Sequence, residues 1–125
     1  MLKHIVLHLA RGPGFPLGST AHGYDIVAPL QADGHLDAKA WKERRSLCRV
    51  RRFWNGEPDQ VGTLVHRPGG RDGANWRIDY DASRDDDDES GFRLDAHRFC
   101  ENEYVSISDS SGETHTFKVA SVRAT

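Results

Sequence analysis

Apolar and polar residues alternate in three short segments of the last third of the chain. Segments 92–96, 104–108 and 115–119 carry apolar side chains at every second position, and the stretch Asp-Ser-Ser-Gly separates the last two. Period-two alternation is typical of a strand with one buried face, and a short polar stretch ending in glycine is typical of a turn. The pattern predicts a β-meander that ends in a hairpin. Its predicted core residues are Leu94, Val105, Ile107, Phe117 and Val119.

Earlier segments of the chain also have strand character. Segment 2–10 is apolar on both faces, which is typical of a central strand or of a barrel wall. Segment 24–30 predicts a short strand near a sheet edge, because Pro29 lacks the N–H that a central ladder position uses. Segments 47–54 and 61–66 flank a stretch rich in turn residues, so they predict a hairpin.

A single helix is predicted, over residues 37–45. Asp37 is a suitable N-cap, and Trp41 would face the sheet. Segment 76–81 then alternates again as a strand. About seven short strands with one short helix predict a mainly β fold, either a small barrel or a strongly bent antiparallel sheet.

The end of the meander resembles a common closing hairpin. Residues 102–107, followed by Gly112 and 117–119, are similar to the last hairpin of many small barrels, SH3-like barrels among them. The resemblance covers about thirty residues and contains no ligand-specific motif, so it implies a fold and no activity.

Length and composition limit the classes of protein to consider. A chain of 125 residues predicts one domain spanning 1–125. The net charge of −2 gives no general attraction to nucleic acids or anionic membranes. No apolar run approaches the ~20 residues of a spanning helix. Cys48 and Cys100 are isolated, which is typical of reduced thiols, so we expect a cytoplasmic protein with no membrane partner.

Two loops stand out between the predicted strands. The first is a Gly/Pro loop over 11–23, and the second is an acidic loop over 82–91. The glycines of the first loop are not followed by the Gly-Lys-Ser/Thr of a phosphate-binding loop. Long loops on rigid scaffolds often hold binding residues, so Phe15 and His22 are candidates for ligand binding.

Arginines cluster in the predicted strand segment 47–54. Arg49, Arg51 and Arg52 are interleaved with Phe53 and Trp54, a mixture that resembles the surface of single-stranded nucleic-acid binders. We therefore add the three arginines and Trp54 to the candidate binding residues. The alternative is an exposed strand whose arginines pair with nearby carboxylates, the acidic loop included, and so blunt a sheet edge.

We predict no metal site and no cofactor. His4 and His8 share a strand face, but four residues of strand separate them by ~13 Å, and the chain has no histidine pair at i, i+2. The acidic run 85–89 lacks the glycine and the flanking helices of an EF-hand. A weak cation site there remains the alternative.

The leading functional hypothesis is a non-catalytic binding or interaction module, with a protein or a nucleic acid as partner. No catalytic residue is assigned under this hypothesis. The alternative is a small hydrolase or isomerase with acid/base histidines in a pocket at the barrel mouth, and a third possibility is a homodimer through an uncovered sheet edge. The candidate histidines of the enzyme hypothesis are His22, His66, His97 and His115.

Overall fold

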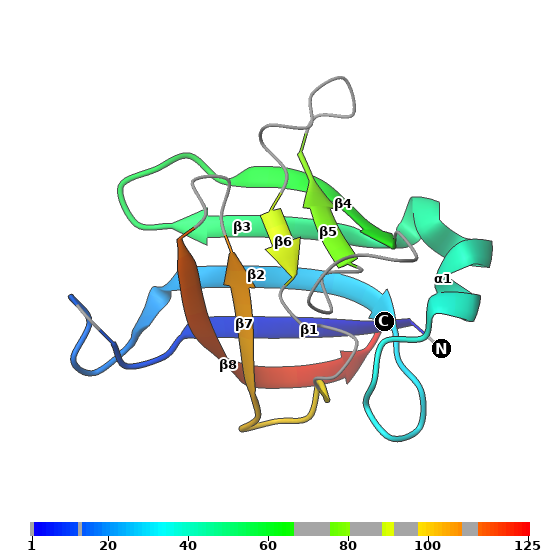
Figure 1. Ribbon diagram of the computed structural model, residues 1–125, viewed down its shortest axis with the longest axis horizontal. Coiled ribbons are helices and arrows are strands. Elements are labelled where there is room, and N and C mark those ends of the chain that lie inside the picture. The colour runs from blue at the N-terminus through cyan, green and yellow to red at the C-terminus, as the bar shows by residue number, and fades with distance from the viewer. Residues whose placement is uncertain (1, 13, 67–75, 81–88, 92–97, 109–112) are drawn as a thin grey trace.

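The chain folds into a barrel of antiparallel strands (Figure 1). The structure is a computed structural model, and it describes residues 2–12, 14–66, 76–80, 89–91, 98–108 and 113–125. The strands are β1 (Leu2–Leu9), β2 (Ser19–Pro29), β3 (Arg49–Trp54), β4 (Gln60–His66), β5 (Trp76–Asp79), β6 (Glu89–Gly91), β7 (Tyr104–Ser108) and β8 (Thr114–Ala124). A helix, α1 (Ala38–Arg44), and a 3₁₀ turn, η1 (Arg45–Leu47), stand between β2 and β3.

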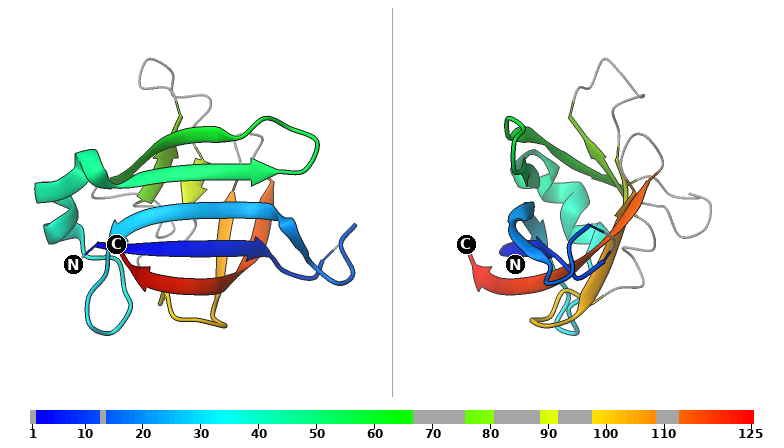
Figure 2. Two further views of the ribbon diagram at one scale, coloured as in Figure 1. Left: turned by 180° about the vertical axis from the view of Figure 1, so that it is seen from behind. Right: turned by 90° about the vertical axis from the view of Figure 1, so that its left-hand side faces the viewer.

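The strands are hydrogen-bonded in sequence order, and β8 returns to pair with β1. Seen from behind, β1, β2, β3 and β8 form the near wall, and β5, β6 and β7 lie beyond it (Figure 2). The prediction of a mainly β barrel with one short helix is confirmed. Each of the eight described strands pairs with a neighbour on both sides, although β6 and β7 share a single residue pair, Ser90 with Ser108, so a homodimer through a sheet edge stays a prediction.

Side chains at every second strand position point inward and fill the barrel. Of the predicted core, Val105, Ile107, Phe117 and Val119 are buried, while Leu94 lies outside the described residues. Inward residues of the other strands complete one continuous cluster. Burying each large apolar side chain contributes about 1.5–3 kcal/mol to the stability of the fold. The largest of them are Ile5, Leu7, Tyr24, Ile26, Leu64, Trp76 and Ile78.

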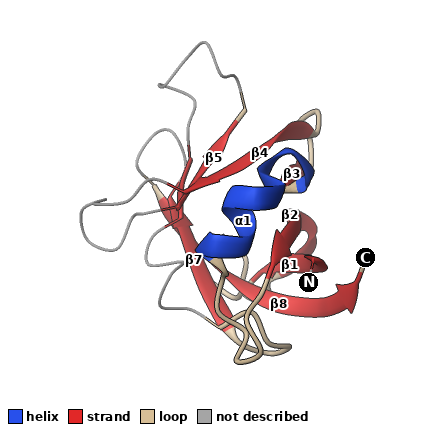
Figure 3. Ribbon diagram, turned by 90° about the vertical axis from the view of Figure 1, so that its right-hand side faces the viewer, coloured by secondary structure: helices blue, strands red, loops and turns tan. Residues whose placement is uncertain are grey.

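Helix α1 lies across one end of the barrel (Figure 3). The Asp37 carboxylate accepts a hydrogen bond from the Ala40 N–H at 3.0 Å, which satisfies one of the free donors of the first turn. Trp41 is buried, and its Nε1–H donates to the Leu64 carbonyl at 2.8 Å. The predicted helix over 37–45 is therefore present, with Asp37 and Arg45 as its caps.

The second strand differs from its prediction. Instead of a short edge strand over 24–30, β2 has 11 residues and lies between β1 and β3. Pro29 is tolerated because it is the last residue of β2, and the pairing with β3 ends at Ile26, so no neighbour needs its missing N–H.

The two predicted loops are also shorter than expected. Because β2 begins at Ser19, the first loop covers only 10–18, and we call it the β1–β2 loop. Strand β6 occupies the last three residues of the predicted acidic loop, whose residues 82–88 lie outside the described part of the chain.

Candidate binding site

A bulge in β2 shapes the barrel mouth, the end opposite α1 (Figure 1). His8 of β1 pairs with Gly23, but the next residue, Leu9, pairs with Ser19, so β2 holds three extra residues between these pairs. The pairing with β3 continues regardless as far as His22, which lies opposite Trp54. Bulges bend a strand and redirect its side chains, and this one brings His22 next to the β1–β2 loop.

Four rings meet at the barrel mouth, and we call them the mouth cluster: Phe15, His22, Trp54 and His115. The His22 ring lies between Phe15, at a centroid distance of 4.8 Å, and Trp54, at 4.4 Å. Trp54 also contacts His115 of β8 at 5.4 Å. The two contacts of His22 are edge-to-face, and contacts of this kind stabilise by about 0.5–1.5 kcal/mol each. The cluster therefore attaches the β1–β2 loop, through Phe15, to the barrel wall.

Ser19 fixes the orientation of the His22 ring. Its Oγ lies 2.7 Å from His22 Nδ1 and accepts a hydrogen bond from the Ala21 N–H at 3.1 Å. Since this backbone N–H already donates to the oxygen, the hydroxyl hydrogen is available for Nδ1 of a neutral imidazole. Ser19 and His22 therefore form a local turn that is held by side-chain hydrogen bonds.

Arg52 lies beneath the mouth cluster. Its side chain points inward and is mostly buried, and its guanidinium stacks on Trp54 at 4.5 Å from the ring centroid. Nη1 donates to the Glu57 carboxylate at 3.2 Å. Burial lowers the pKa of His22 from its usual 6.5, and the positive charge of Arg52 lowers it further, against a smaller opposing effect of Glu57.

Stability should fall in mildly acidic solution because of His22. Its pKa is lower in the folded than in the unfolded chain, so the stability due to neutral His22 is complete above about pH 6.5 and is lost as the pH falls through the folded-state value. We expect the midpoint of thermal unfolding to drop between about pH 7.5 and about pH 5.5. The variant His22→Asn, which keeps a polar group near Nδ1, should show a smaller drop. Equal drops in both proteins would contradict the assignment.

A groove runs along the outside of the barrel beside the mouth. Its volume is about 710 Å³, within the range of ligand-binding clefts. The β1–β2 loop and the outer faces of β1, β7 and β8 form its walls. Two of its apolar side chains are highly exposed, Leu17 at 90% and Tyr104 at 55%. The lining residues are His8, Leu9, Ala10, Arg11, Leu17, Gly18, Ser19, Thr20, Tyr104, Thr116 and Lys118.

Strand register builds the floor of this groove. Lys118 of β8 pairs with Tyr104 on one side and with His8 on the other, so the three residues form a row across β7, β8 and β1. Arg11 adds a second full positive charge from the loop. In the described part of the chain, neither Arg11 nor Lys118 forms an ion pair, so both charges are available to a ligand.

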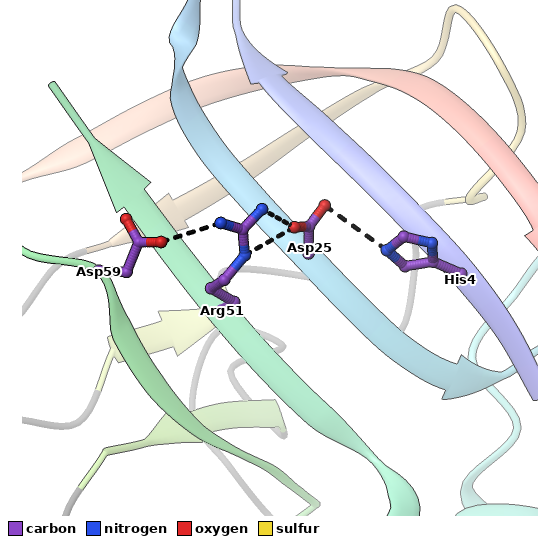
Figure 4. Close-up of polar contacts among 4 residues, drawn as sticks. All are labelled: His4, Asp25, Arg51 and Asp59. Atoms are coloured by element: carbon purple, nitrogen blue, oxygen red, sulfur yellow. Dashed lines mark hydrogen bonds and ion pairs between the residues drawn. The ribbon is translucent and has the colours of Figure 1, made fainter.

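The arginines of β3 point to opposite sides of the barrel wall. Arg51 is on the outer face, where it pairs with Asp25 and, at 2.9 Å, with Asp59; His4 approaches the same Asp25 at 3.5 Å (Figure 4). These carboxylates raise the pKa of Arg51, and the hydrogen bond that Arg51 donates to Asp25 contributes most. Arg49 is exposed, whereas Arg52 is directed inward. The predicted pairing with nearby carboxylates is present, but β3 is an interior strand with neighbours on both sides.

The six predicted binding residues therefore divide into two groups. Phe15, His22, Arg52 and Trp54 come together at the barrel mouth. Arg49 and Arg51 lie on the outer wall, apart from that cluster. Inward and outward positions alternate along a strand, so neighbouring residues such as Arg51 and Arg52 face opposite ways.

Sequence reasoning missed the residues that line the groove. Lys118 and Tyr104 read as ordinary outward positions of the meander, and only the register places them beside His8. Leu17 did carry a signal, since it is an apolar residue between Pro16 and Gly18 in a loop with no predicted strand to bury it. Of the other candidate histidines, His66 lies at the α1 end against Trp41 and Trp76, and His97 is outside the described residues.

No group of three His, Cys, Asp or Glu side chains gathers in the described residues as a metal site would require. Both cysteines are free thiols; Cys48 is buried, and its burial raises the pKa of the thiol. Among the described helices, none is both long enough and apolar enough to cross a bilayer. Comparison with protein-family models, curated proteins and solved structures finds no match to this chain.

Proposed function

We propose that this protein is a non-catalytic binding domain and that its ligand lies in the groove between the β1–β2 loop and the outer faces of β1, β7 and β8. The observation that carries the proposal is the groove itself, a hollow of about 710 Å³ with Leu17 at 90% exposure. Exposed apolar side chains beside unpaired charges are typical of a ligand site. The mouth cluster supports the site from behind by holding Phe15 and the loop in place.

A nucleic-acid surface on β3 has less support. Such a surface needs several cations that are free to contact phosphates. Arg51 is already neutralised by Asp25 and Asp59, and Arg52 pairs with Glu57 at the barrel mouth. Arg49 alone does not make a track for a polyanion.

A Ser–His pair at the barrel mouth is the one observation that favours the alternative of a hydrolase or isomerase. Ser19 lines the groove and lies 2.7 Å from a neutral His22. A nucleophilic serine also needs a group that orients the histidine, and Glu57, the carboxylate that acts on His22, is hydrogen-bonded to Arg52. The Ser19 oxygen accepts a backbone hydrogen bond, which reduces its nucleophilicity. Binding therefore explains the arrangement better than acyl transfer does.

A cytoplasmic location is part of the proposal. Free thiols at Cys48 and Cys100 persist in the reducing cytosol, whereas oxidising compartments favour disulfides.

Titration with 8-anilinonaphthalene-1-sulfonate, an amphipathic anion, tests the proposed site. We expect amide chemical-shift changes in the ¹⁵N-labelled protein at Leu17, Tyr104 and Lys118, because the groove offers apolar contact and positive charge together. Leu17→Ser should weaken the binding about fivefold, since it removes an exposed anchor without touching the core. Shifts confined to Trp41 and Arg45, which line a separate hollow of about 270 Å³ at the α1 end, would overturn the proposal.

A further inference from the structure

The groove is positively charged on a protein whose net charge is −2. Its lining holds Arg11, Lys118 and His8, and no Asp or Glu is among the described residues that line it. Two acidic side chains of the outer wall, Asp25 and Asp59, are bound to Arg51 and do not line the groove. A local excess of cations attracts and orients a negatively charged ligand.

The same groove carries apolar anchors and hydroxyl groups. Leu17 comes from the β1–β2 loop and Tyr104 from β7, and both present most of their side chain to solvent. Thr20 and Thr116 add hydroxyls that can bond to the main chain of a ligand. The ligand should therefore combine an apolar side chain, negative charge and polar backbone groups.

We infer that the groove binds a short, extended peptide segment in which carboxylates flank an apolar side chain. This inference rests on the proposed function and names its partner. The row from Tyr104 through Lys118 to His8 crosses two strand spacings, roughly 10 Å, which is the length of about three extended residues. An apolar side chain of the peptide packs between Leu17 and Tyr104, and its carboxylates contact Lys118 and Arg11.

A peptide fits the groove better than a single-stranded nucleic acid does. Among the described residues, the groove offers two permanent cations and the rings of Tyr104 and His8, whereas a nucleic-acid track uses several cations and several stacking rings. Leu17, the most exposed apolar residue, is aliphatic and cannot stack on a base as an aromatic ring does.

The test uses a capped hexapeptide with two leucines among four glutamates, titrated into the ¹⁵N-labelled full chain. We expect shift changes at Arg11, Leu17, Tyr104 and Lys118. Replacing the glutamates of the peptide by glutamine, or its leucines by serine, should weaken binding about tenfold. In the protein, Lys118→Glu should weaken it to a similar degree. The matched control is Arg49→Glu, which removes an exposed arginine outside the groove and should leave the affinity unchanged.

Each alternative result has a distinct meaning. If the anilinonaphthalene sulfonate binds the groove but the glutamate and glutamine peptides bind equally, the acidic class of partner is wrong while the site stands. If neither probe shifts the groove residues, the proposed function fails as well. If a twelve-nucleotide oligothymidylate binds more tightly than the acidic peptide, the partner is a nucleic acid and the inference is overturned.

Discussion

Replacing Trp41 by alanine is expected to lower the free energy of unfolding by about 4 kcal/mol. Trp41 is the residue through which α1 packs on the barrel: it is 7% exposed, it contacts the His66 and Trp76 rings at 5.9 Å, and its Nε1–H donates to the Leu64 carbonyl. The substitution removes the buried rings and leaves that carbonyl without its donor. Equilibrium unfolding in urea, followed by circular dichroism, measures the loss.

Two companion variants separate the causes. Trp41→Phe keeps an aromatic ring and removes the hydrogen bond, so it should cost about 2 kcal/mol. Leu47 lies close by in η1 and is 50% exposed. Leu47→Ala should therefore change the free energy of unfolding by less than about 0.5 kcal/mol. If Trp41→Ala costs no more than Leu47→Ala, the helix is not held to the barrel by this side chain.

Gly23→Ala is expected to destabilise the protein by about 3 kcal/mol, a large effect for one added methyl group. A Cβ at this position would overlap the Leu7 carbonyl oxygen and would lie 2.9 Å from the Leu7 carbonyl carbon and 3.0 Å from Phe53 Cζ. Backbone atoms cannot move aside as a side-chain end can, so β1 and β2 would have to separate at the bulge. Thermal unfolding monitored by tryptophan fluorescence measures the effect.

The same substitution at Gly12 is the control. Nothing lies within 4 Å of a Cβ built there, and the residue does not have a positive φ, so Gly12→Ala should be neutral within about 0.5 kcal/mol. Gly23→Ala should also broaden or shift the NMR signals of His22, because the bulge that positions this ring begins at Gly23. A stable Gly23→Ala protein with unchanged His22 signals would show that the close approach is not required.

Local patterns were sufficient to predict most of the elements. Alternation identified β5, β7 and β8, because a strand at the surface of a core repeats every two residues. The apolar run 2–10 identified β1, and the turn residues between segments 47–54 and 61–66 identified β3 and β4. Asp37 identified the start of α1 because its side chain caps the first turn within four residues of sequence. Pro29 led to the wrong prediction of an edge strand. Proline is excluded only where a neighbouring strand needs its N–H, and here β3 is too short to reach Pro29.

The candidate site could be predicted only in part. Phe15 and His22 were chosen because they occur in a long loop rich in glycine and proline, and the structure does bring them together with Trp54. Strand alternation alone separates Arg51 from Arg52, but their partners, Asp25 and Glu57, come from a different strand and from a turn, so only the structure identifies them. The groove was not predicted at all, because its floor joins residues more than ninety positions apart, such as His8 and Lys118.

The sequence by itself determined the class of fold, the helix and its cap, and four of the residues that fill the barrel, Val105, Ile107, Phe117 and Val119. These features depend on interactions between residues near one another in the chain and on the burial of apolar side chains, both of which leave a periodic signal. Only the tertiary structure decided the barrel closure between β1 and β8, the bulge that turns His22 into the barrel mouth, and the cationic groove beside it. Strand register sets these features, and register depends on hydrogen bonds between distant segments whose pairing no local pattern specifies.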